Sequence, residues 1–384
     1  MNSIPLCVPY LTGLEKKYVN SAIESGWVSS VGPQVDQFEH NFSNFIESKN
    51  SVALSSGTSA IHLSLILSGV GESDEVLVPS LTFISPINCI KYVGANPLFI
   101  DVDYNTGQID ANILEKFIKR HTIFKNNNLF NKITGNKIKA ILPVHILGYS
   151  ADIKKIVDIA RKFNLKVIED ATEGLGTTFK DKKIGTYGDF GCFSFNGNKL
   201  ITTGSGGMLI SNSSVDLDKA KHLSTQAKSH SSEYIHDQIG YNYRLSNISA
   251  AFGIAQLENI DDFIDKKNKI HDYYMASLQM IEGIEFFEKN INSNCIIWLN
   301  TIKIDPEKYG MNSRELMKIF KNDNIETRPL WQPLHMSTLF SNNHYYGNKN
   351  SEKLYLNSLS IPSSVGLNIE QQNSVIDLIK KNAK

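Results

Sequence analysis

Hydrophobic residues in the first two-thirds of the chain follow two alternating patterns. Short apolar runs rich in β-branched residues are separated by longer stretches in which apolar residues recur with the period of a helix. Continuous apolar runs are typical of parallel strands, because helices bury both faces of a parallel sheet. The pattern predicts strands at residues 52–55, 75–79, 97–101, 139–144, 166–170, 191–195 and 207–211, and helices such as 59–68 and 152–163. We therefore expect an α/β fold with a mainly parallel sheet covered by helices.

The pattern changes near residue 248. A long helical stretch over 248–281 is followed by 296–304, where apolar and polar residues alternate as they do in a half-buried strand. Further helices are expected at 313–322 and 370–380. These elements predict a large domain over residues 1–259 and a smaller α+β domain over residues 260–384.

The segment 120–137 interrupts the regular alternation of strands and helices. It is rich in Asn and Lys and lies between a predicted helix and the next strand. Polar segments in such positions usually form loops. We expect a plain surface loop here, with a lid over a site as the alternative.

Composition narrows the class of partner. The 39 Lys and Arg residues balance 39 Asp and Glu residues, so the formal net charge is zero. A neutral chain lacks the long-range field that would attract nucleic acid or an anionic bilayer. The first residues do not resemble a signal peptide, and no apolar run approaches the roughly 20 residues that span a bilayer. We expect a cytoplasmic protein that acts on small molecules and binds neither nucleic acid nor membrane.

Several common ligand motifs are absent from the sequence. The four cysteines Cys7, Cys89, Cys192 and Cys295 are far apart, which indicates small buried hydrophobic residues rather than disulfides or a zinc site. The glycines at 204, 206 and 207 lack the third glycine of a dinucleotide-binding turn, and there is no P-loop. No H-E-x-x-H motif is present, and we expect no metal.

Three polar segments lie at or beyond the ends of predicted strands, where an open α/β sheet presents its ligand crevice. The turn at 55–59 opens a helix, and Gly57 lets a phosphate approach free backbone N–H groups. Asp170 ends a strand, where a carboxylate can stabilise a protonated ring nitrogen. Lys199 lies in a glycine-rich connection, where a partly desolvated amine can act as a nucleophile. Taken singly, each segment has an ordinary alternative: a helix N-cap, a loop charge or a solvated lysine.

The order and spacing of these three segments resemble the fold-type I pyridoxal phosphate (PLP) enzymes, specifically the DegT/StrS-type sugar aminotransferases. The likeness covers nearly the whole chain. It includes Trp27-Val28-Ser29, the stretch GYNYRLSNISAAFGIAQL from Gly240 and the stretch ETRPLWQPLH from Glu326. The resemblance implies the fold-type I architecture, with a large PLP-binding domain and a smaller C-terminal domain.

The resemblance also implies roles for individual residues. Lys199 would bind the cofactor covalently and move the proton during transfer, and Asp170 would pair with the ring nitrogen. Glu173 takes a position near the cofactor's phenolic oxygen where many relatives carry Gln or His. The other cofactor-binding residues would be Gly57, Thr58 and Ser194 at the phosphate, Phe83 on the ring face, and Asn242 reaching the phosphate from a neighbouring subunit. Trp27, Ser29, Arg328 and His335 match segments that flank the substrate.

Alternative interpretations stay open for some of these residues. Phe83 has core packing as its alternative, and Asn242 has a place in a turn. Arg244 could serve the phosphate or the structure, and His145 is as easily structural as functional.

A lysine at position 199 favours transamination, because relatives that deoxygenate sugars carry histidine there. L-glutamate would leave its amine on the cofactor as pyridoxamine phosphate, and a nucleotide-linked keto sugar would take it up, in a homodimer with shared active sites. The segments FNGNKLITTGSGGM and TQAKSH look most like the aminotransferases of legionaminic acid and bacillosamine assembly. Those enzymes act at C4 of a UDP- or GDP-linked 2-acetamido-2,6-dideoxy-4-keto-hexose. A 3-keto sugar or aminocyclitol ketone is the alternative substrate, and a non-catalytic PLP-binding sensor is the alternative function.

Overall fold

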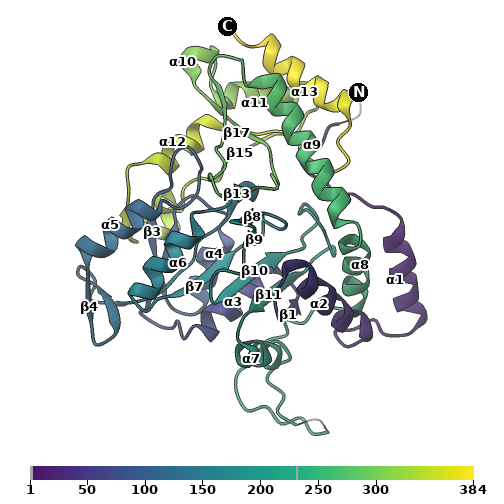
Figure 1. Ribbon diagram of the computed structural model, residues 1–384, viewed down its shortest axis with the longest axis vertical. Coiled ribbons are helices and arrows are strands. Elements are labelled where there is room, and N and C mark those ends of the chain that lie inside the picture. The colour runs from purple at the N-terminus through teal and green to yellow at the C-terminus, as the bar shows by residue number, and fades with distance from the viewer. Residues whose placement is uncertain (1–2, 231) are drawn as a thin grey trace.

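The short apolar runs form one large sheet in the computed structural model, which describes residues 3–230 and 232–384 (Figure 1). The main path of the sheet is β1-β11-β10-β7-β6-β2-β3-β16. Neighbouring strands are parallel from β10 to β16, and β11 runs antiparallel to both of its neighbours, β1 and β10. These strands are β1 (Asn50–Leu54), β2 (Glu75–Pro79), β3 (Asn96–Ile100), β6 (Lys137–Ile141), β7 (Lys166–Asp170), β10 (Phe190–Ser194), β11 (Gly207–Ser211) and β16 (Tyr345–Tyr346). All seven predicted strands are present, and the α/β prediction is confirmed.

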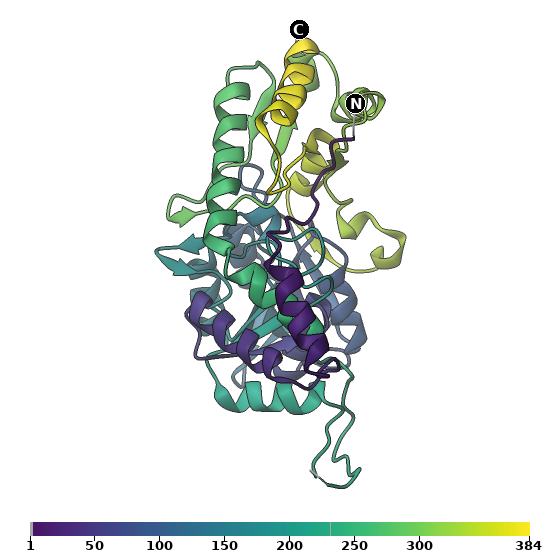
Figure 2. The same cartoon turned by 90° about the vertical axis from the view of Figure 1, so that its right-hand side faces the viewer.

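Helices bury both faces of this sheet, which explains the continuous apolar runs. In β2, Val76 and Val78 face one apolar cluster while Leu77 faces the other. Fully burying one such side chain stabilises the fold by about 1.5–3 kcal/mol. The helices on the Leu77 side are α2 (Pro33–Ile46), α5 (Ala111–His121), α6 (Ile153–Lys162) and α8 (Asn247–Leu257); those on the other side are α3 (Gly57–Leu67), α4 (Ser85–Tyr92) and α7 (Ser214–Ser224). α1 (Leu14–Glu24) lies beside α8 (Figure 2).

The segment 120–137 is a β-hairpin, so the prediction of a plain loop was wrong. Its strands are β4 (Thr122–Lys125) and β5 (Asn128–Asn131), and β5 pairs with the first residues of β6. Asn126 and Asn127 have φ values of 49° and 59°, and asparagine tolerates the positive φ that a two-residue hairpin turn requires. The Asn- and Lys-rich composition of the segment hid the hairpin, and the two apolar residues of β4, Ile123 and Phe124, are exposed and form no buried run.

The C-terminal third builds a third apolar cluster around a small sheet. The helical stretch that follows residue 248 divides into α8 and α9 (Ile260–Leu278), and α9 leads into the cluster. Its sheet has the order β12-β14-β17-β15. The elements are β12 (Ile284–Phe286), β14 (Thr301–Ile304), β15 (Arg328–Pro329), β17 (Ser358–Ser360), α10 (Pro306–Tyr309), α11 (Ser313–Asn322), α12 (Asn350–Asn357) and α13 (Ile369–Lys381); a separate small sheet joins β13 (Ser293–Asn294), β8 (Thr178–Phe179) and β9 (Lys182–Lys183).

The predicted strand at 296–304 is strand only in its second half. Residues 301–304 form β14, which is buried throughout because strands flank it on both sides. Ile297, Trp298 and Leu299 instead pack irregularly into an apolar cluster of the large sheet. The strand β16 also joins that sheet, so the C-terminal third contacts the large sheet at more than one place. The division near residue 260 stays a prediction.

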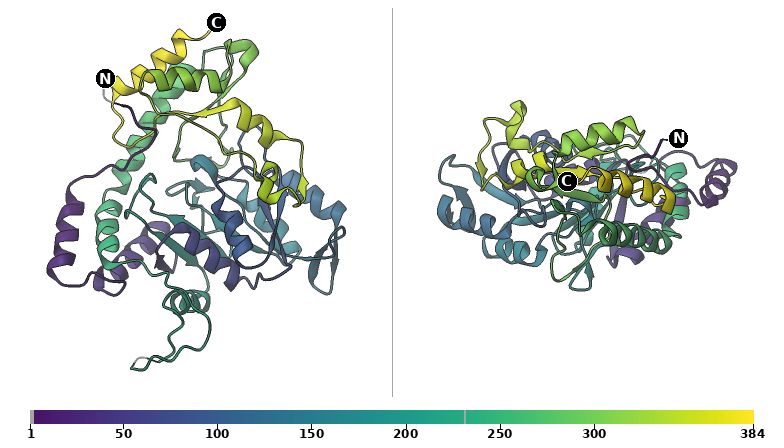
Figure 3. Two further views of the ribbon diagram at one scale, coloured as in Figure 1. Left: turned by 180° about the vertical axis from the view of Figure 1, so that it is seen from behind. Right: turned by 90° about the horizontal axis from the view of Figure 1, so that it is seen from above.

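One segment extends away from the rest of the molecule. Residues 225–242, called the arm below, leave the end of α7 and return towards α8, as the views in Figures 1 and 3 show at the base of the molecule. Backbone pairs such as Thr225 with Asn242 and Lys228 with His236 hold the two sides of the arm together. Among the described helices, none is long and apolar enough to cross a membrane.

Candidate active site

A cavity of about 380 Å³ lies where β7 and β10 end and α3 begins. Seven of the eight predicted cofactor-binding residues line it: Gly57, Thr58, Phe83, Asp170, Glu173, Ser194 and Lys199. They come from segments far apart in the sequence. The parallel sheet brings them together because its strands end at the same edge.

The predicted anion-binding turn is the N-terminus of α3. Ser56 caps the helix by accepting the N–H of Ser59 at 3.0 Å, and the N–H groups of a first helical turn attract anions. A Cβ atom on Gly57 would lie 2.9 Å from the Cβ of Ser194. Glycine is therefore required at 57 for Ser194, at the end of β10, to lie against the helix end.

Asp170 forms the acidic side of the cavity. It is the last residue of β7 and is buried, and its Oδ1 accepts the N–H of Thr172 at 3.1 Å. Burial raises the pKa of the Asp170 carboxyl, and the hydrogen bonds from Thr172 and the charge of Lys199 offset part of this rise. A cationic group placed against Asp170 would favour its ionised form.

Lys199 directs its amine into the cavity between an acid and an aromatic ring. Its Nζ lies 3.4 Å from Oε1 of Glu173 and 3.9 Å from the centre of the Trp298 ring. The Lys199 and Glu173 side chains are 13% and 6% exposed. Burial raises the pKa of the Glu173 carboxyl, and the nearby charge of Lys199 counteracts this.

Phe83 is a cavity residue and not a core residue. Its side chain is 55% exposed and lines the cavity. An aromatic face in this position is available to stack on a planar ligand. The core-packing alternative for Phe83 is therefore wrong.

Five predicted residues lie outside the cavity of their own chain. Asn242 is exposed at the base of the arm, and Trp27 and Ser29 are exposed between α1 and α2. Arg328 is exposed and donates to the backbone oxygen of Thr327 at 3.0 Å. His335 bonds Ser80 and stacks on Tyr345, with 3.9 Å between the ring centres. The roles implied for these five stay predictions.

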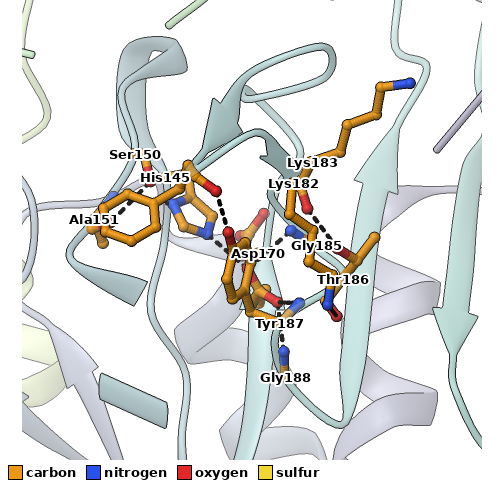
Figure 4. Close-up of polar contacts among 12 residues, drawn as sticks. His145, Ser150, Ala151, Asp170, Lys182, Lys183, Gly185, Thr186, Tyr187 and Gly188 are labelled. Atoms are coloured by element: carbon orange, nitrogen blue, oxygen red, sulfur yellow. Dashed lines mark hydrogen bonds and ion pairs between the residues drawn. The ribbon is translucent and has the colours of Figure 1, made fainter. Parts of the chain in front are cut away.

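His145 and Glu169 form a buried structural group behind the cavity, as the close-up in Figure 4 shows for His145. Nδ1 of His145 accepts the N–H of Ala151 at 3.2 Å, and Nε2 lies 3.2 Å from the Glu169 carboxylate. The other contacts of Glu169 are with the N–H groups of Gly185, Tyr187 and Gly188, at 2.7–2.8 Å. Strand alternation thus directs Asp170 to the cavity and Glu169 to this turn.

Arg244 forms a buried ion pair with Glu39. Its Nη1 lies 2.8 Å from Oε1 of Glu39, and both side chains are largely buried. Breaking such a pair would leave a buried charge without a partner. The structural alternative for Arg244 is the one that the geometry favours.

Sequence reasoning missed two tryptophans and several polar residues of the cavity. Trp298 and Trp331 line it, and the chain has only three tryptophans, so their rarity was the one available signal. The missed polar residues are Thr82, Ser85, Thr172, Asn196 and Asn198. No spacing rule indicated them because they lie in connections or at helix ends.

The cavity fits PLP in charge, shape and donor set. PLP has a phosphate, a basic ring nitrogen and an aldehyde, and the cavity offers the α3 N-terminus with Ser194, the Asp170 carboxyl and the Lys199 amine. Two cavity residues also carry a polar atom without a hydrogen-bond partner among the described residues: Oγ1 of Thr82 and Oδ1 of Asn198, both buried. The cavity would also leave the Phe83 ring free to cover the cofactor.

Comparison with known proteins agrees with this site. The profile of the DegT/DnrJ/EryC1/StrS aminotransferase family matches residues 9–380. EpsN of Bacillus subtilis strain 168, whose name describes a PLP-dependent aminotransferase, is 37% identical over 380 residues, which cover 98% of this chain and 95% of EpsN. The GDP-perosamine synthase of Escherichia coli O157:H7 is 38% identical over 371 residues, covering 97% of this chain and 96% of the synthase. The crystal structure of a DegT DnrJ EryC1 StrS aminotransferase from Brucella abortus superimposes with a TM-score of 0.86 at 25% identity, covering 96% of this chain and 95% of that one.

Proposed function

The chain belongs to the DegT/DnrJ/EryC1/StrS aminotransferase family, and we propose that it transfers the amino group of L-glutamate to C4 of a nucleotide-linked keto sugar. The predictions of a PLP-dependent aminotransferase and of a sugar as the class of substrate are confirmed. Our proposal adds the amino-group donor L-glutamate, the C4 position of the new amine and the nucleotide that carries the sugar. We propose a UDP- or GDP-linked 2-acetamido-2,6-dideoxy-4-keto-hexose as acceptor, in legionaminic acid or bacillosamine-type biosynthesis.

The observation that carries the proposal is that Lys199 and Asp170 line one cavity together with the N-terminus of α3. When bound, PLP supplies an electron sink for the carbon that exchanges its amine. The chain would supply the groups around it: Asp170 would hold the ring nitrogen, and the α3 N-terminus with Ser194 would hold the phosphate. Lys199 would attach the cofactor, and once the amine of the amino-acid donor has displaced it, its free Nζ would take and return the proton at the reacting carbon. Proton transfer by a positioned side chain typically contributes about 10²–10⁴-fold to a rate.

We further propose that the working unit is a homodimer in which each site is completed by its partner. Asn242 and the arm lie outside the cavity of their own chain, and the arm exposes large apolar side chains. Tyr234 and Ile239 are 91% and 86% exposed. Exposed apolar side chains in one projecting segment are typical of a surface that another protein covers.

A second acceptor has support of its own. The GDP-perosamine synthase of Escherichia coli matches 97% of this chain at 38% identity. This similarity favours the GDP-linked keto-sugar precursor of perosamine as the second candidate substrate.

The substrate proposal is tested with purified, PLP-loaded protein. The protein is incubated with L-glutamate and one keto sugar at a time: the UDP-linked and GDP-linked 2-acetamido 4-keto sugars, the GDP-linked precursor of perosamine, a 3-keto nucleotide sugar and an aminocyclitol ketone. Mass spectrometry and NMR then identify the product. We expect an amine at C4 of an acetamido sugar, with 2-oxoglutarate formed in equal amount. Turnover of the 3-keto sugar or the cyclitol ketone alone would contradict the proposal.

A further inference from the structure

Leu147 has a left-handed backbone conformation in the short helix η1 (Ile146–Gly148) next to the cavity. Its φ is 61° and its ψ is 5°, values that a branched side chain such as leucine rarely adopts. The neighbouring Gly148 approaches the backbone so closely that a Cβ atom there would lie 2.1 Å from the oxygen of Ile296. Such conformations persist where the surrounding contacts hold them, and they concentrate at functional sites.

The backbone of Leu147 contacts both groups that surround the Lys199 amine. Its N–H donates to Oε2 of Glu173 at 2.7 Å, and its oxygen accepts the N–H of Trp298 at 2.9 Å. Oε1 of the same Glu173 lies 3.4 Å from Nζ of Lys199, and the Trp298 ring lies 3.9 Å from it. Lys199, Glu173, Leu147 and Trp298 therefore form a closed ring of contacts.

Trp298 is held at two further points. Its indole N–H donates to the oxygen of Asn198 at 2.6 Å, and its own oxygen accepts from Nζ of Lys267 at 2.5 Å. Lys267 projects from α9, is 1% exposed and also donates to the oxygen of Ser363. With these contacts and only 6% exposure, Trp298 presents a fixed ring face to Lys199.

We propose that Leu147, Glu173 and Trp298 position the Lys199 amine, with the carboxylate on one side of the amine and the indole face on the other. Carboxylates and indole faces both attract an ammonium group. A lysine side chain is long and flexible, and holding its end in one direction lowers the entropy cost of each proton transfer. Trp298 is thus a positioning residue. The kinetic consequence rests on the proposed function, whereas the order of the amine in the apoprotein does not.

The first test measures the accessibility of the amine in the apoprotein. Wild type, Trp298→Leu and Trp298→Phe are labelled with acetic anhydride, and the rate at Lys199 is read by peptide mass spectrometry against the exposed Lys49. We expect Lys199 to react about threefold faster in Trp298→Leu, which lacks the aromatic face. In Trp298→Phe the rate stays within about twofold of wild type, because a ring is retained. Equal rates in Trp298→Leu and wild type would overturn the proposal.

Phe287→Leu is the matched control for loosening of the core. Phe287 is 5% exposed and belongs to the same apolar cluster as Trp298, but it lies outside the cavity. We expect its substitution to leave the labelling rate of Lys199 unchanged. An equal acceleration in Phe287→Leu would show that general destabilisation, and not the lost indole face, exposes the amine.

The second test compares kcat with KM on a ketone that the wild type aminates. In Trp298→Leu we expect kcat to fall about tenfold with KM within about twofold, because misplaced reacting groups slow the reaction more than they weaken binding. Trp298→Phe should recover most of the loss. A rise in KM with kcat unchanged would overturn the positioning role. If no ketone is aminated while the labelling result holds, the proposed function fails and the positioning of the amine stands.

Discussion

Asp170 destabilises the folded apoprotein at neutral pH. Burial raises the pKa of its carboxyl above the value in the unfolded chain. The folded state therefore binds this proton more tightly than the unfolded state does. The stabilisation that this tightly bound proton gives the folded state is fully present below the ordinary aspartate pKa. It is lost as the pH rises through the raised pKa.

We therefore expect Asp170→Asn to stabilise the apoprotein at pH 7, by roughly 2 °C in melting temperature. Asparagine is isosteric, keeps Oδ1 for the N–H of Thr172 and carries no charge at any pH. The gain should shrink towards pH 3, where the wild-type carboxyl is protonated. Scanning calorimetry of both apoproteins from pH 3 to 8 measures it. Asp158→Asn, at an exposed position on α6, is the control, and a gain that grew at low pH would contradict the assignment.

Lys199→Ala should abolish transamination while the protein stays folded. The expected loss is at least about a thousandfold, since the variant lacks the group that moves the proton. Absorbance at the wavelength of the covalently bound cofactor and borohydride trapping of the pyridoxyl peptide would report the missing link. Lys139→Ala, which removes a lysine outside the cavity, should leave turnover intact. Normal turnover of Lys199→Ala would refute the mechanism.

At the scale of elements, the contact between α3 and β10 shapes the predicted phosphate site. Gly57 leaves no room for a side chain, because its Cβ atom would meet Ser194 and also lie 3.1 Å from Cγ2 of Thr172. Gly57→Ala must push the end of β10 away from the helix. The phosphate contacts of the first turn would then be lost in part.

For Gly57→Ala we expect affinity for PLP to fall about tenfold, as the loss of one or two charge-assisted hydrogen bonds predicts. Titration of the apoprotein with PLP, followed by absorbance, measures the dissociation constant. Gly71→Ala provides the matched control, because a Cβ atom at Gly71 meets nothing within 4 Å. Unchanged affinity in Gly57→Ala would show that the α3 N-terminus does not hold the phosphate.

The elements that the sequence predicted correctly share one property: their hydrophobic pattern alone shows how they are buried. The strands of the large sheet are buried on both faces, so each is a plain apolar run. The hairpin 120–137 was missed because its sequence is rich in Asn and Lys and its turn depends on the φ values of Asn126 and Asn127. Residues 296–300 alternate like a strand, but their neighbours in space are cavity and core residues and not a second strand.

At the scale of the whole molecule, the arm and Asn242 predict how two chains cooperate. Asn242→Ala should retain PLP less well, because the residue is proposed to reach the phosphate of the partner subunit. Mixing Asn242→Ala with Lys199→Ala should restore about a quarter of the wild-type activity if subunits exchange at random, since half the dimers are mixed and each has one intact site. Activity assays before and after mixing test this, with analytical ultracentrifugation to confirm the dimer. Absence of complementation would contradict the shared site.

The residue types and their order along the chain were sufficient for the α/β class, the family and seven residues that line the cavity, because strand ends and turn chemistry are local properties that a sequence displays. The contacts that enclose the Lys199 amine could not be predicted from the residue types and their order. Glu173 and Trp298 approach the amine from separate segments, and the backbone of Leu147 joins these two residues. Their contacts arise when α9 and the irregular stretch at 296–300 pack onto the sheet. Packing between distant segments leaves no periodic trace, so the surroundings of the reactive amine became visible in the folded chain alone.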